Sequence, residues 1–523
     1  MFRGMVKGAM ALAAAMLLIQ PAAAGWLQAR SKHFVIYSEA SDANLHDFAT
    51  RLEQLDAALR ALSRSPDRDG VEANPVTIFL LPNIDAIRTL YSNRPSEVGG
   101  FYLPRAEGSV AFAPLSTAER TGLRDHEIVQ GALSPTVILY HEYGHHFLLG
   151  HFTAAYPSWF SEGYAEVVST ATVKGNEVVI GNAANHRAGS LFSGKSLSIE
   201  QLLASSQQRM TADQVAEVYA RGWLMTHFVM FNDERVAKFG AYLKLLNSGT
   251  PSLDAARQAF GDLKQLDHDL QKYLSSRLPG KLIKLDDVPS ITIETVSEGA
   301  SAMMDARMRS ARGVDSERAK KVFAQGKSVA ARYPDDPVVQ TWFAEMAYDA
   351  GEELAAEAAA DRALARDPKS IPALLYKARV LLRRAEAAKA DAKTWSAARN
   401  WVVKANHVDP NNAPALLLYY FSFQHQGTPP PPSAITGLRK AFYLVPQDPE
   451  LRLLVARQDI MSGDSATARQ TLAPLAYDPH AAIDNPAARL IADLAAGKSG
   501  QDALTAFDAA VEHARKADTG EKE

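Results

Sequence analysis

The chain has 523 residues, 47% of them apolar, a formal net charge of −3 and no cysteine. This length predicts two or more domains, and the balanced charge, with no basic stripe or zinc-finger pattern, argues against nucleic-acid binding. Without cysteine there is no disulfide, no thiolate metal ligand and no cysteine nucleophile.

The first 24 residues have the pattern of a secretory signal peptide. Arg3 and Lys7 give a positive start, residues 9–19 are apolar, and the alanines at 22–24 form an A-x-A cleavage site before Gly25. An uncleaved anchor is the alternative, although the apolar run is shorter than the about 20 residues of a membrane span. No later segment resembles a span. We therefore expect an exported protein without a stable membrane span after cleavage, periplasmic in a Gram-negative cell.

The next part of the chain combines strands and a helix. Residues 33–37 and the apolar run at 76–81, which prolines bound, predict two strands, and residues 44–62 predict a helix between them. Ser109–Ala113 is a further extended segment. We expect it to be either an ordinary strand of the sheet or an edge strand that binds a substrate backbone by strand addition.

The most informative motif is an H-E-x-x-H sequence at residues 141–145. Its histidines are four residues apart, so they lie on one face of a helix and can reach one metal ion. A helix is predicted from about residue 135 to 149, with Ser134 as its N-cap and a proline at its first position. In this motif the glutamate, Glu142, is a general base that polarises a metal-bound water.

A catalytic zinc normally has three protein ligands and one open position, so His141 and His145 need a third partner. Our first choice is Glu162, which belongs to a second helix predicted after the break at residues 157–158. Glu166 lies four residues later on the same face, where it could orient a ligand histidine. The metal is then held by imidazole and carboxylate groups alone, and Zn²⁺ is the ion we expect.

His151 is the alternative third ligand. It stands at the third-histidine position of the pattern H-E-x-x-H-x-x-G-x-x-H. That pattern needs a glycine for a sharp turn where this chain has Leu148, and leucine disfavours the positive φ of such a turn. Both Glu162 and His151 remain candidates, with Glu162 preferred.

These motifs resemble those of the bacterial peptidase-MA-like gluzincins. The resemblance rests on the H-E-x-x-H motif, on W-F-S-E-G-Y-A-E at residues 159–166 and on Y-A-R-G-W at residues 219–223, and it covers roughly residues 30–275. It implies a zincin-like α+β fold and a zinc metallopeptidase activity. The G-x-M-E-N motif of the large aminopeptidases is absent, so there is no basis for expecting an aminopeptidase.

The resemblance also implies a residue that stabilises the oxyanion of the reaction intermediate. Tyr219 is the candidate, and His227 is the reserve. The alternative is that Tyr219, Trp223 and Phe228 are core residues of an amphipathic helix, which is the commoner role of aromatic side chains.

The composition changes after residue 280. Residues 279–301 contain prolines, glycines and a short β-like run at 291–293, so we place the domain boundary there and interpret residues 281–300 as a linker. The predicted organisation is a signal peptide at 1–24, a zincin-like domain at 25–280, the linker at 281–300 and a helical repeat domain at 301–523.

The C-terminal region has a repeated pattern of alanine and proline. Alanines precede each of three prolines by five and by twelve residues: Ala363 and Ala356 before Pro368, Ala405 and Ala398 before Pro410, and Ala441 and Ala434 before Pro446. This small-residue pattern is typical of tetratricopeptide (TPR) repeats, although the proline spacings of 42 and 36 exceed the usual period of 34. Extra residues near 385–393 would explain the longer spacing. The alternative is a helical domain without repeats.

Two functional hypotheses follow from an α+β zincin-like catalytic domain joined to an all-α TPR-like solenoid. In the first, the protein is an exported zinc metallopeptidase: His141, His145 and Glu162 hold Zn²⁺, Glu142 activates water, and the substrate is a peptide or protein. In the second, it is a non-catalytic TPR scaffold or interaction protein of the cell envelope with a relic zincin domain. Both hypotheses include a protein partner on the solenoid.

Overall fold

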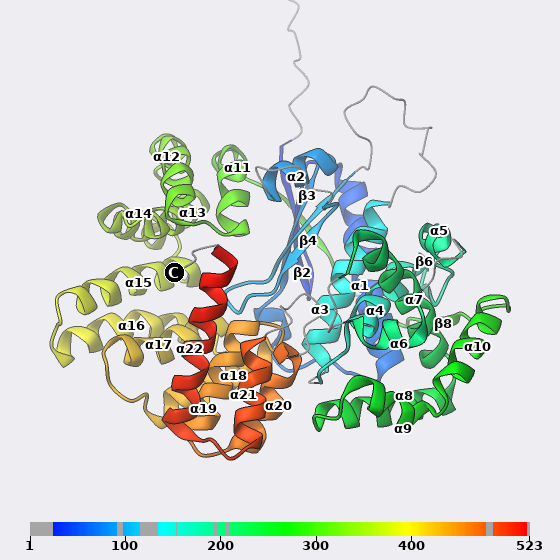
Figure 1. Ribbon diagram of the computed structural model, residues 1–523. Helices are drawn as coiled ribbons and strands as arrows, with labels where there is room; N and C mark the ends of the chain where they lie inside the picture. Colours follow the sequence, from blue (N-terminus) through cyan, green and yellow to red (C-terminus); the bar gives the residue numbers. More distant parts are fainter. Residues whose placement is uncertain are drawn as a thin grey trace, which may run out of the picture.

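The structure is a computed structural model that describes residues 25–91, 98–115, 134–152, 154–192, 197–205, 210–287, 289–476 and 485–519. The predicted signal peptide at 1–24 lies outside the described residues. An α+β region comes first in the chain, and an array of helices follows from residue 298 (Figure 1). Within the described ranges, no helix is both long and apolar enough to cross a membrane.

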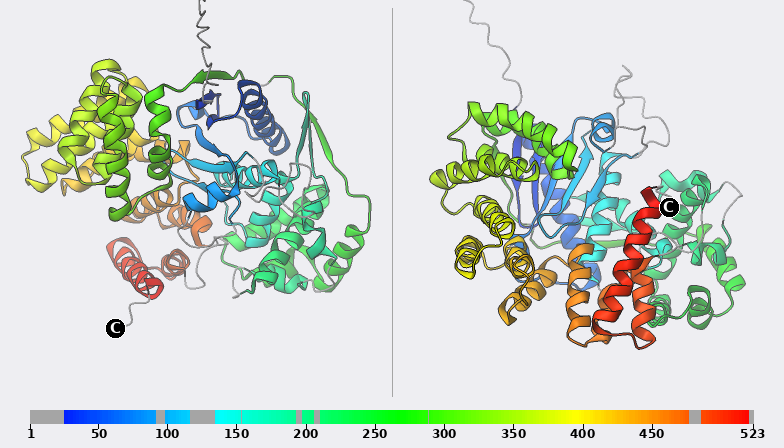
Figure 2. Two further views of the ribbon diagram at one scale, coloured as in Figure 1. Left: turned by 90° about the horizontal axis from the view of Figure 1, so that it is seen from above. Right: turned by 60° about the vertical axis from the view of Figure 1, so that its left-hand side comes forward.

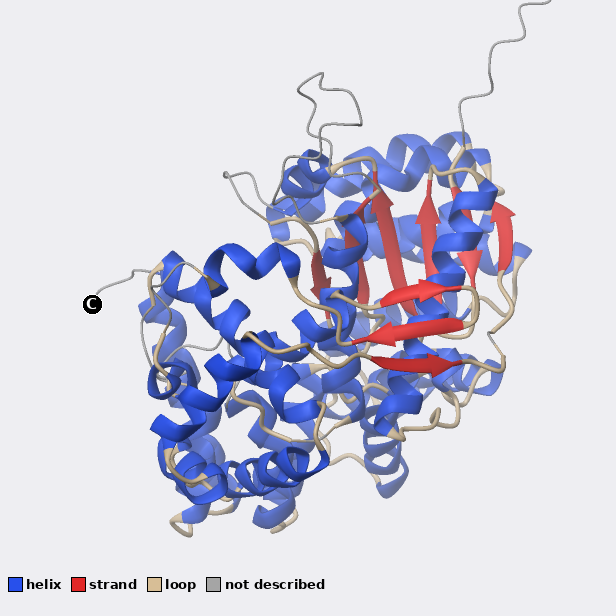
Figure 3. Ribbon diagram, turned by 90° about the vertical axis from the view of Figure 1, so that its right-hand side faces the viewer, coloured by secondary structure: helices blue, strands red, loops and turns tan. Residues whose placement is uncertain are grey.

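A six-stranded sheet forms the centre of the α+β region (Figure 3). Its strands, in spatial order, are β4 (Phe101–Leu103), β5 (Val110–Pro114), β3 (Val76–Leu81), β2 (Phe34–Ser38), β1 (Leu27–Arg30) and β9 (Thr292–Thr295). The inner strands β5, β3 and β2 are parallel, and the outer pairings are antiparallel. The two strands predicted at 33–37 and 76–81 are confirmed.

The segment interpreted as a linker contains two strands of the α+β region. Strand β9 pairs with β1, so it forms one edge of the main sheet. Strand β8 (Lys281–Lys284) joins β7 (Glu177–Ile180) and β6 (Thr172–Lys174) in a second, three-stranded sheet. The linker interpretation is therefore wrong for residues 281–284 and 292–295. Their partners lie more than a hundred residues away in sequence. The β-like run at 291–293 indicated an extended segment but not its partner strand.

Helices cover the sheet and extend to one side of it. They are α1 (Asp42–Ser63), α2 (Ile84–Tyr91), α3 (Pro135–His151), α4 (Ser158–Ser169), α5 (Ala188–Leu191), α6 (Ile199–Leu203), α7 (Ala212–Met230), α8 (Asp233–Asn247), α9 (Ser252–Phe260) and α10 (Leu263–Leu274). Helix α1 confirms the prediction at 44–62. Helix α3 begins as predicted, because the Ser134 hydroxyl accepts a hydrogen bond from the Val137 amide at 3.2 Å and Pro135 follows the cap.

The array consists of antiparallel helix pairs. The pairs are α11 (Glu298–Arg312) with α12 (Ser316–Arg332), α13 (Pro337–Asp349) with α14 (Glu353–Arg366), α15 (Ile371–Ala387) with α16 (Ala392–Val408), α17 (Ala413–His425) with α18 (Pro432–Leu444), α19 (Pro449–Met461) with α20 (Ser465–Ala476), and α21 (Pro486–Ala495) with α22 (Gly500–Thr519). In Figure 2 they curve around the sheet on the side opposite α4–α10.

The predicted repeat pattern is confirmed by burial. All six alanines are buried at the contacts between paired helices: Ala356, Ala363, Ala398, Ala405, Ala434 and Ala441. Their small side chains let neighbouring helices approach closely. The 42-residue spacing arises because α15 and α16 have 17 residues each, whereas α17 and α18 have 13. The extra length is about one helical turn in each helix.

The main sheet is buried on both faces, by different parts of the chain. In β3, Ile78 and Leu80 belong to the core shared with α1 and α3, whereas Phe79 and Leu81 belong to a core shared with α11 and α13. Alternate residues of a strand point to opposite faces, so the run at 76–81 is apolar throughout. The α+β region and the first helix pairs therefore share one core instead of meeting across a linker.

Strand β5 is an interior strand. It pairs with β3 on one side and with β4 on the other, so its backbone groups are already hydrogen-bonded. Of the two alternatives for Ser109–Ala113, the ordinary strand is correct, and β4 forms the edge beside α3. Sequence could not distinguish them, because β4 has only three residues.

The loop at residues 104–109, between β4 and β5, inserts into the array. Arg105 donates hydrogen bonds from its two terminal nitrogens to the carbonyls of Ala311 and Arg312, both at 2.8 Å, where α11 ends. Charged and polar side chains of the array hold the rest of the loop: Arg379 pairs with Glu107, Asp448 accepts from the Ala106 amide, and Gln447 donates to the Ser109 hydroxyl. The array thus already binds one peptide segment of its own chain.

Candidate metal centre

Helix α3 presents both motif histidines on one side. The ring centroids of His141 and His145 are 4.9 Å apart, and their Nε2 atoms are separated by 3.2 Å. Both rings are mostly buried, with 14% and 17% of the side chain exposed. The spacing of one helical turn therefore places two potential ligand atoms side by side, as the motif predicts.

Helix α4 brings Glu162 to these two nitrogens. Its Oε2 atom lies 3.4 Å from His141 Nε2 and 3.5 Å from His145 Nε2. Zinc–ligand distances of about 2.0–2.2 Å in a tetrahedron separate neighbouring ligand atoms by about 3.3–3.6 Å. The three donor atoms already have this spacing, and one carboxylate with two imidazoles is a common zinc donor set. The residues present therefore fit Zn²⁺.

Glycines allow the helices to approach closely enough for this contact. A Cβ on Gly163 would lie 2.2 Å from the carbonyl oxygen of Gly222 in α7, and one on Gly222 would lie 2.5 Å from the carbonyl oxygen of Trp159. A Cβ on Gly144 would lie 2.8 Å from the Cα of Ala165. No larger residue fits at these crossings. The glycines within the two motifs thus position Glu162 against α3.

A second layer of charged groups surrounds His141. Glu166 is 1% exposed, and its Oε1 lies 3.3 Å from His141 Nδ1, as expected for a residue that orients this ring. Its carboxylate also accepts from His186 at 2.7 Å and from Arg187 at 2.5 Å. Burial opposes ionisation of Glu166, but these three cationic or hydrogen-bonding partners outweigh it and hold its pKa below the usual range.

The carboxylates of Glu162 and Glu166 also change the pKa of the His141 imidazole. Burial lowers its pKa, but hydrogen bonds and charge from Glu162 and Glu166 outweigh this and raise it to about 10. Two buried carboxylates therefore favour a positive charge at this point. A divalent cation would supply such a charge in place of the proton.

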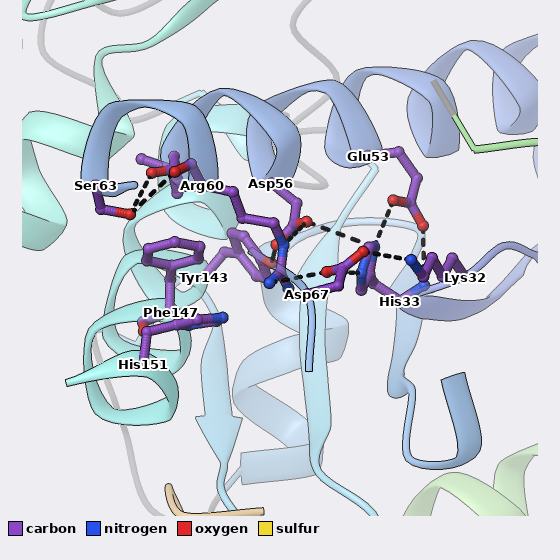
Figure 4. A network of polar contacts seen from close by, with 11 residues as sticks. Lys32, His33, Glu53, Asp56, Arg60, Ser63, Asp67, Tyr143, Phe147 and His151 are labelled. Atoms are coloured by element: carbon purple, nitrogen blue, oxygen red, sulfur yellow. Dashed lines mark hydrogen bonds and ion pairs between the residues drawn. The ribbon is translucent and has the colours of Figure 1, made fainter. Parts of the chain in front are cut away.

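His151 lies away from the site. Its ring stacks on Phe147 at a centroid distance of 4.1 Å, and its Nδ1 donates to the Phe147 carbonyl at 2.9 Å (Figure 4). Burial, aided by the nearby charge of Arg60, lowers its pKa to about 4, so the ring is neutral. Of the two candidates for a third ligand, the structure brings Glu162 to the histidines and leaves His151 in a packing role.

Tyr219 lies at the site and His227 does not. The Tyr219 ring stacks on His141 at 5.8 Å between ring centroids, and the guanidinium of Arg187 lies 4.9 Å from the Tyr219 ring centroid. Burial and the charge of Glu162 raise the pKa of its phenol. His227 is fully buried, with hydrogen bonds to the Gly181 carbonyl and the Tyr273 hydroxyl, both at 2.9 Å. Of these two residues of α7, Tyr219 therefore lies at the site and His227 lies in the core.

A cavity separates the metal motif from the array. It has a volume of about 230 Å³, and both regions line it. Its lining includes Glu142 and His145 of α3 and Gln447 and Arg452 of the array. Elsewhere along this boundary, the loop at 104–109 fills the space between the two regions. Neither the cavity nor its array residues have any signal in the sequence.

A second cluster of ionisable groups lies on the far side of α3 (Figure 4). His33, buried in the core, donates from Nδ1 to Glu53 at 2.7 Å and from Nε2 to Asp67 at 3.0 Å. Two carboxylate acceptors require both ring nitrogens to carry protons. The remaining partners balance the charge: Arg60 pairs with Asp56 and Asp67, Lys32 pairs with Asp67, and Tyr143 donates to Asp56. Three cations and three carboxylates make this an ion-pair network and not a metal site.

This network predicts a stability that falls at alkaline pH. Burial lowers the pKa of His33, but its bonds to Asp67 and Glu53 and the charge of Asp56 raise it to about 9. A folded-state pKa above the unfolded value of about 6.5 stabilises the protonated form. The contribution, up to about 3 kcal/mol, is complete below pH 6.5 and is lost as pH rises through 9. Urea unfolding at pH 6.5 and 9.5 should show this loss.

The control for this experiment is His33→Asn, which removes the titrating group. The variant should be less stable at pH 6.5 and should show a smaller loss between the two pH values than the natural protein. Equal pH dependence in both proteins would contradict the assignment of the effect to His33.

Comparisons with known proteins return TPR proteins. No family model and no curated protein matches this chain. The chain is similar to the solved structure of a thermophilic TPR protein in Thermus thermophilus, with 19% identity over 41% of this chain and 98% of that chain, and a TM-score of 0.30. It is also similar to MamA from Desulfovibrio magneticus, with 18% identity over 34% of this chain and 92% of that chain, and a TM-score of 0.25. A third similar structure is a tetratricopeptide repeat protein from Parabacteroides merdae, with 13% identity over 55% of this chain and 93% of that chain, and a TM-score of 0.30.

The C-terminal array is TPR-like. The prediction that this chain hydrolyses peptide bonds is corrected, because the matching structures are TPR proteins and nothing in the comparisons indicates catalysis. The α+β character of the N-terminal region is present, whereas its zincin-like fold remains a prediction.

Proposed function

We propose that this chain is a non-catalytic TPR-type interaction protein that binds a peptide segment of a partner protein between its array and its α+β region. The observation that carries the proposal is the loop at 104–109, which the array holds as it would hold a ligand. Solenoids of this kind use their inner surfaces to bind extended segments. The predicted signal peptide would place this interaction outside the cytoplasm, in the periplasm of a Gram-negative cell.

The contacts to this loop indicate how the array would recognise a peptide. Asp448 binds a main-chain amide and Arg379 binds a carboxylate, while Arg105 reaches the carbonyls at the end of α11. Main-chain contacts of this type depend little on sequence, and charged contacts add selectivity. Next to the loop, the 230 Å³ cavity provides space that the chain itself does not fill. One residue of a partner segment would enter there.

The metal has a structural role in this proposal. His141, His145 and Glu162 would hold Zn²⁺ and so join α3 to α4, which adds the free energy of metal binding to folding. His145 also lines the cavity, so the metal-binding residues would keep one wall in place. Glu142, beside them, would contribute a carboxylate to the binding surface.

The test is whether the purified protein binds peptides without cleaving them. A fluorescent library of short peptides should contain members that bind and that mass spectrometry recovers intact. Ala154→Phe is the matched variant, because Ala154 lines the cavity and a phenyl ring there would fill it. Binding should weaken at least tenfold in this variant.

Two outcomes would contradict the proposal. One is that no peptide binds the natural protein better than Ala154→Phe. The other is cleavage of bound peptides by the natural protein that disappears in Glu142→Gln, since this would mean a catalytic centre.

A further inference from the structure

Arg452 is a buried cation that faces the cavity. It lies on α19 and is 2% exposed. Its terminal nitrogens donate to the carbonyls of Thr471, at 3.3 Å, and Pro446, at 2.5 Å, and its guanidinium carbon lies 5.1 Å from the ring centroid of Phe442. These contacts hold the side chain in one orientation. Arg452 also lines the cavity, so this fixed side chain belongs to the cavity wall.

Arg452 differs in its charge balance from Arg221, the other arginine that is buried among the described residues. Arg221 pairs with Asp267, and the partly buried Arg307 and Arg379 pair with Glu345 and Glu107. Among the described residues, none forms an ion pair with Arg452, and burial alone lowers its pKa to about 10. It remains charged at neutral pH. A buried cation without a counter-ion is costly in free energy, and the cost is recovered when an anion binds.

Nearby carboxylates do not fill this role. Asp448 is the N-cap residue of α19: one carboxylate oxygen accepts from the Leu451 amide at 2.8 Å and the other accepts from the Ala106 amide. Glu142 lines the same cavity from α3, and its charge does not shift the pKa of Arg452. The described residues therefore leave the counter-ion to a molecule that enters the cavity.

The rest of the cavity indicates the size and polarity of the ligand apart from its anionic group. Its walls are largely apolar, with contributions from Pro104, Leu149, Tyr156, Pro449 and Leu475. The volume of about 230 Å³ is below the roughly 300–1,000 Å³ of pockets for drug-sized ligands, so it accommodates one residue and not a long segment. The carboxylate of Glu142 disfavours a ligand with a second negative charge.

We propose that the cavity binds the C-terminal residue of a peptide, with its free carboxylate on Arg452 and an apolar side chain against the walls. This inference rests on the proposed function and names the part of the partner that is recognised. A chain end offers one carboxylate and an apolar side chain together. An aspartate or glutamate within a chain offers the carboxylate but leaves the apolar walls without a partner. Arginine suits this role because its planar fork binds both carboxylate oxygens.

The test compares three forms of one short peptide by fluorescence polarisation with the purified protein. The first ends in leucine with a free carboxylate, the second has the same sequence with a C-terminal amide, and the third is amidated and has aspartate in place of the leucine. We expect the free-acid peptide to bind at least tenfold more tightly than either amidated peptide. Equal binding of the acid and the amide would overturn the inference, and so would equal binding of the aspartate peptide.

Arg452→Gln should remove the preference for the free acid, and Arg452→Lys should restore part of it. Arg439→Gln is the matched control, because Arg439 is half exposed and pairs with Asp459 outside the cavity. It should keep the full preference. If Arg452→Gln does not fold, Ala154→Phe tests the same site with the cation in place, and binding of the acid should be lost. Acid binding that survives in Ala154→Phe would place the site elsewhere.

The two proposals can fail separately. Peptides that bind without any preference for their end group would leave the interaction proposal standing and would overturn the assignment of Arg452. Absence of peptide binding altogether would overturn both.

Discussion

Replacing Glu162 by alanine is expected to lower the zinc affinity of this protein more than 100-fold, whereas His151→Ala leaves it unchanged. Loss of an outer partner of a metal ligand already costs about 10–100-fold, and a ligand itself contributes more. Glu162 Oε2 lies within 3.5 Å of both histidine nitrogens, while His151 is bonded to the Phe147 carbonyl on the other side of α3. The two variants therefore separate the two candidate ligands directly.

The measurement is metal content after dialysis, together with thermal unfolding with and without a chelator. The natural protein and His151→Ala should each hold one zinc per chain and lose thermal stability when the chelator removes it, because a ligand that binds only the folded state stabilises it. Glu162→Ala should hold no zinc and should not respond to the chelator. Zinc lost in His151→Ala but kept in Glu162→Ala would move the third ligand to His151.

Phe79→Ala is expected to destabilise the α+β region and the first helix pairs of the array together, by about 3–5 kcal/mol. Phe79 is fully buried and stacks between Tyr37 and Phe112, each at 5.3 Å between ring centroids. The same core contains Met303 of α11 and Phe343 of α13. Removing the ring leaves a cavity that borders both regions, so neither region can keep its packing alone.

Hydrogen exchange read by mass spectrometry would check this expectation peptide by peptide. In Phe79→Ala, protection should fall in the main sheet and also in residues 298–349. The matched control is Trp395→Ala, because Trp395 is buried in a core confined to α14–α17. It should lower protection in the middle of the array and leave the sheet unchanged. Loss of protection restricted to the sheet in Phe79→Ala would mean that the two regions are separate domains.

Local patterns explain what could be predicted of the site. The helix that carries His141 and His145 depends on the Ser134 cap, a proline at its start and spacing by one turn, and all of these act over short distances in the chain. Glu162 and Glu166 followed from the same periodicity on a second helix. The glycines of both motifs, Gly144 and Gly163, are explained only by the structure, where they allow helices to touch.

Contacts between segments that are distant in sequence could not be predicted from local sequence patterns. His186 and Arg187, which bind Glu166, lie in a short 3-10 turn with no motif of its own. Arg452 joins the cavity from a helix 310 residues after Glu142, and nothing in its neighbourhood distinguishes it from a surface arginine. The β-like run at 291–293 indicated an extended segment where β9 forms, but not that this strand pairs with β1.

The sequence by itself determined the elements of this protein and their repeats. The caps, the periodicity of the metal motif and the alanine–proline pattern of the array act within one or two helical turns, where the order of residues dictates geometry. Only the tertiary structure decided how these elements combine. The array covers one face of the sheet, residues 281–284 and 292–295 complete two sheets, and Arg452 and Glu142 line one cavity. Such contacts depend on the burial of surfaces from distant parts of the chain, and burial favours any apolar partner of suitable shape, so the sequence does not name the partner.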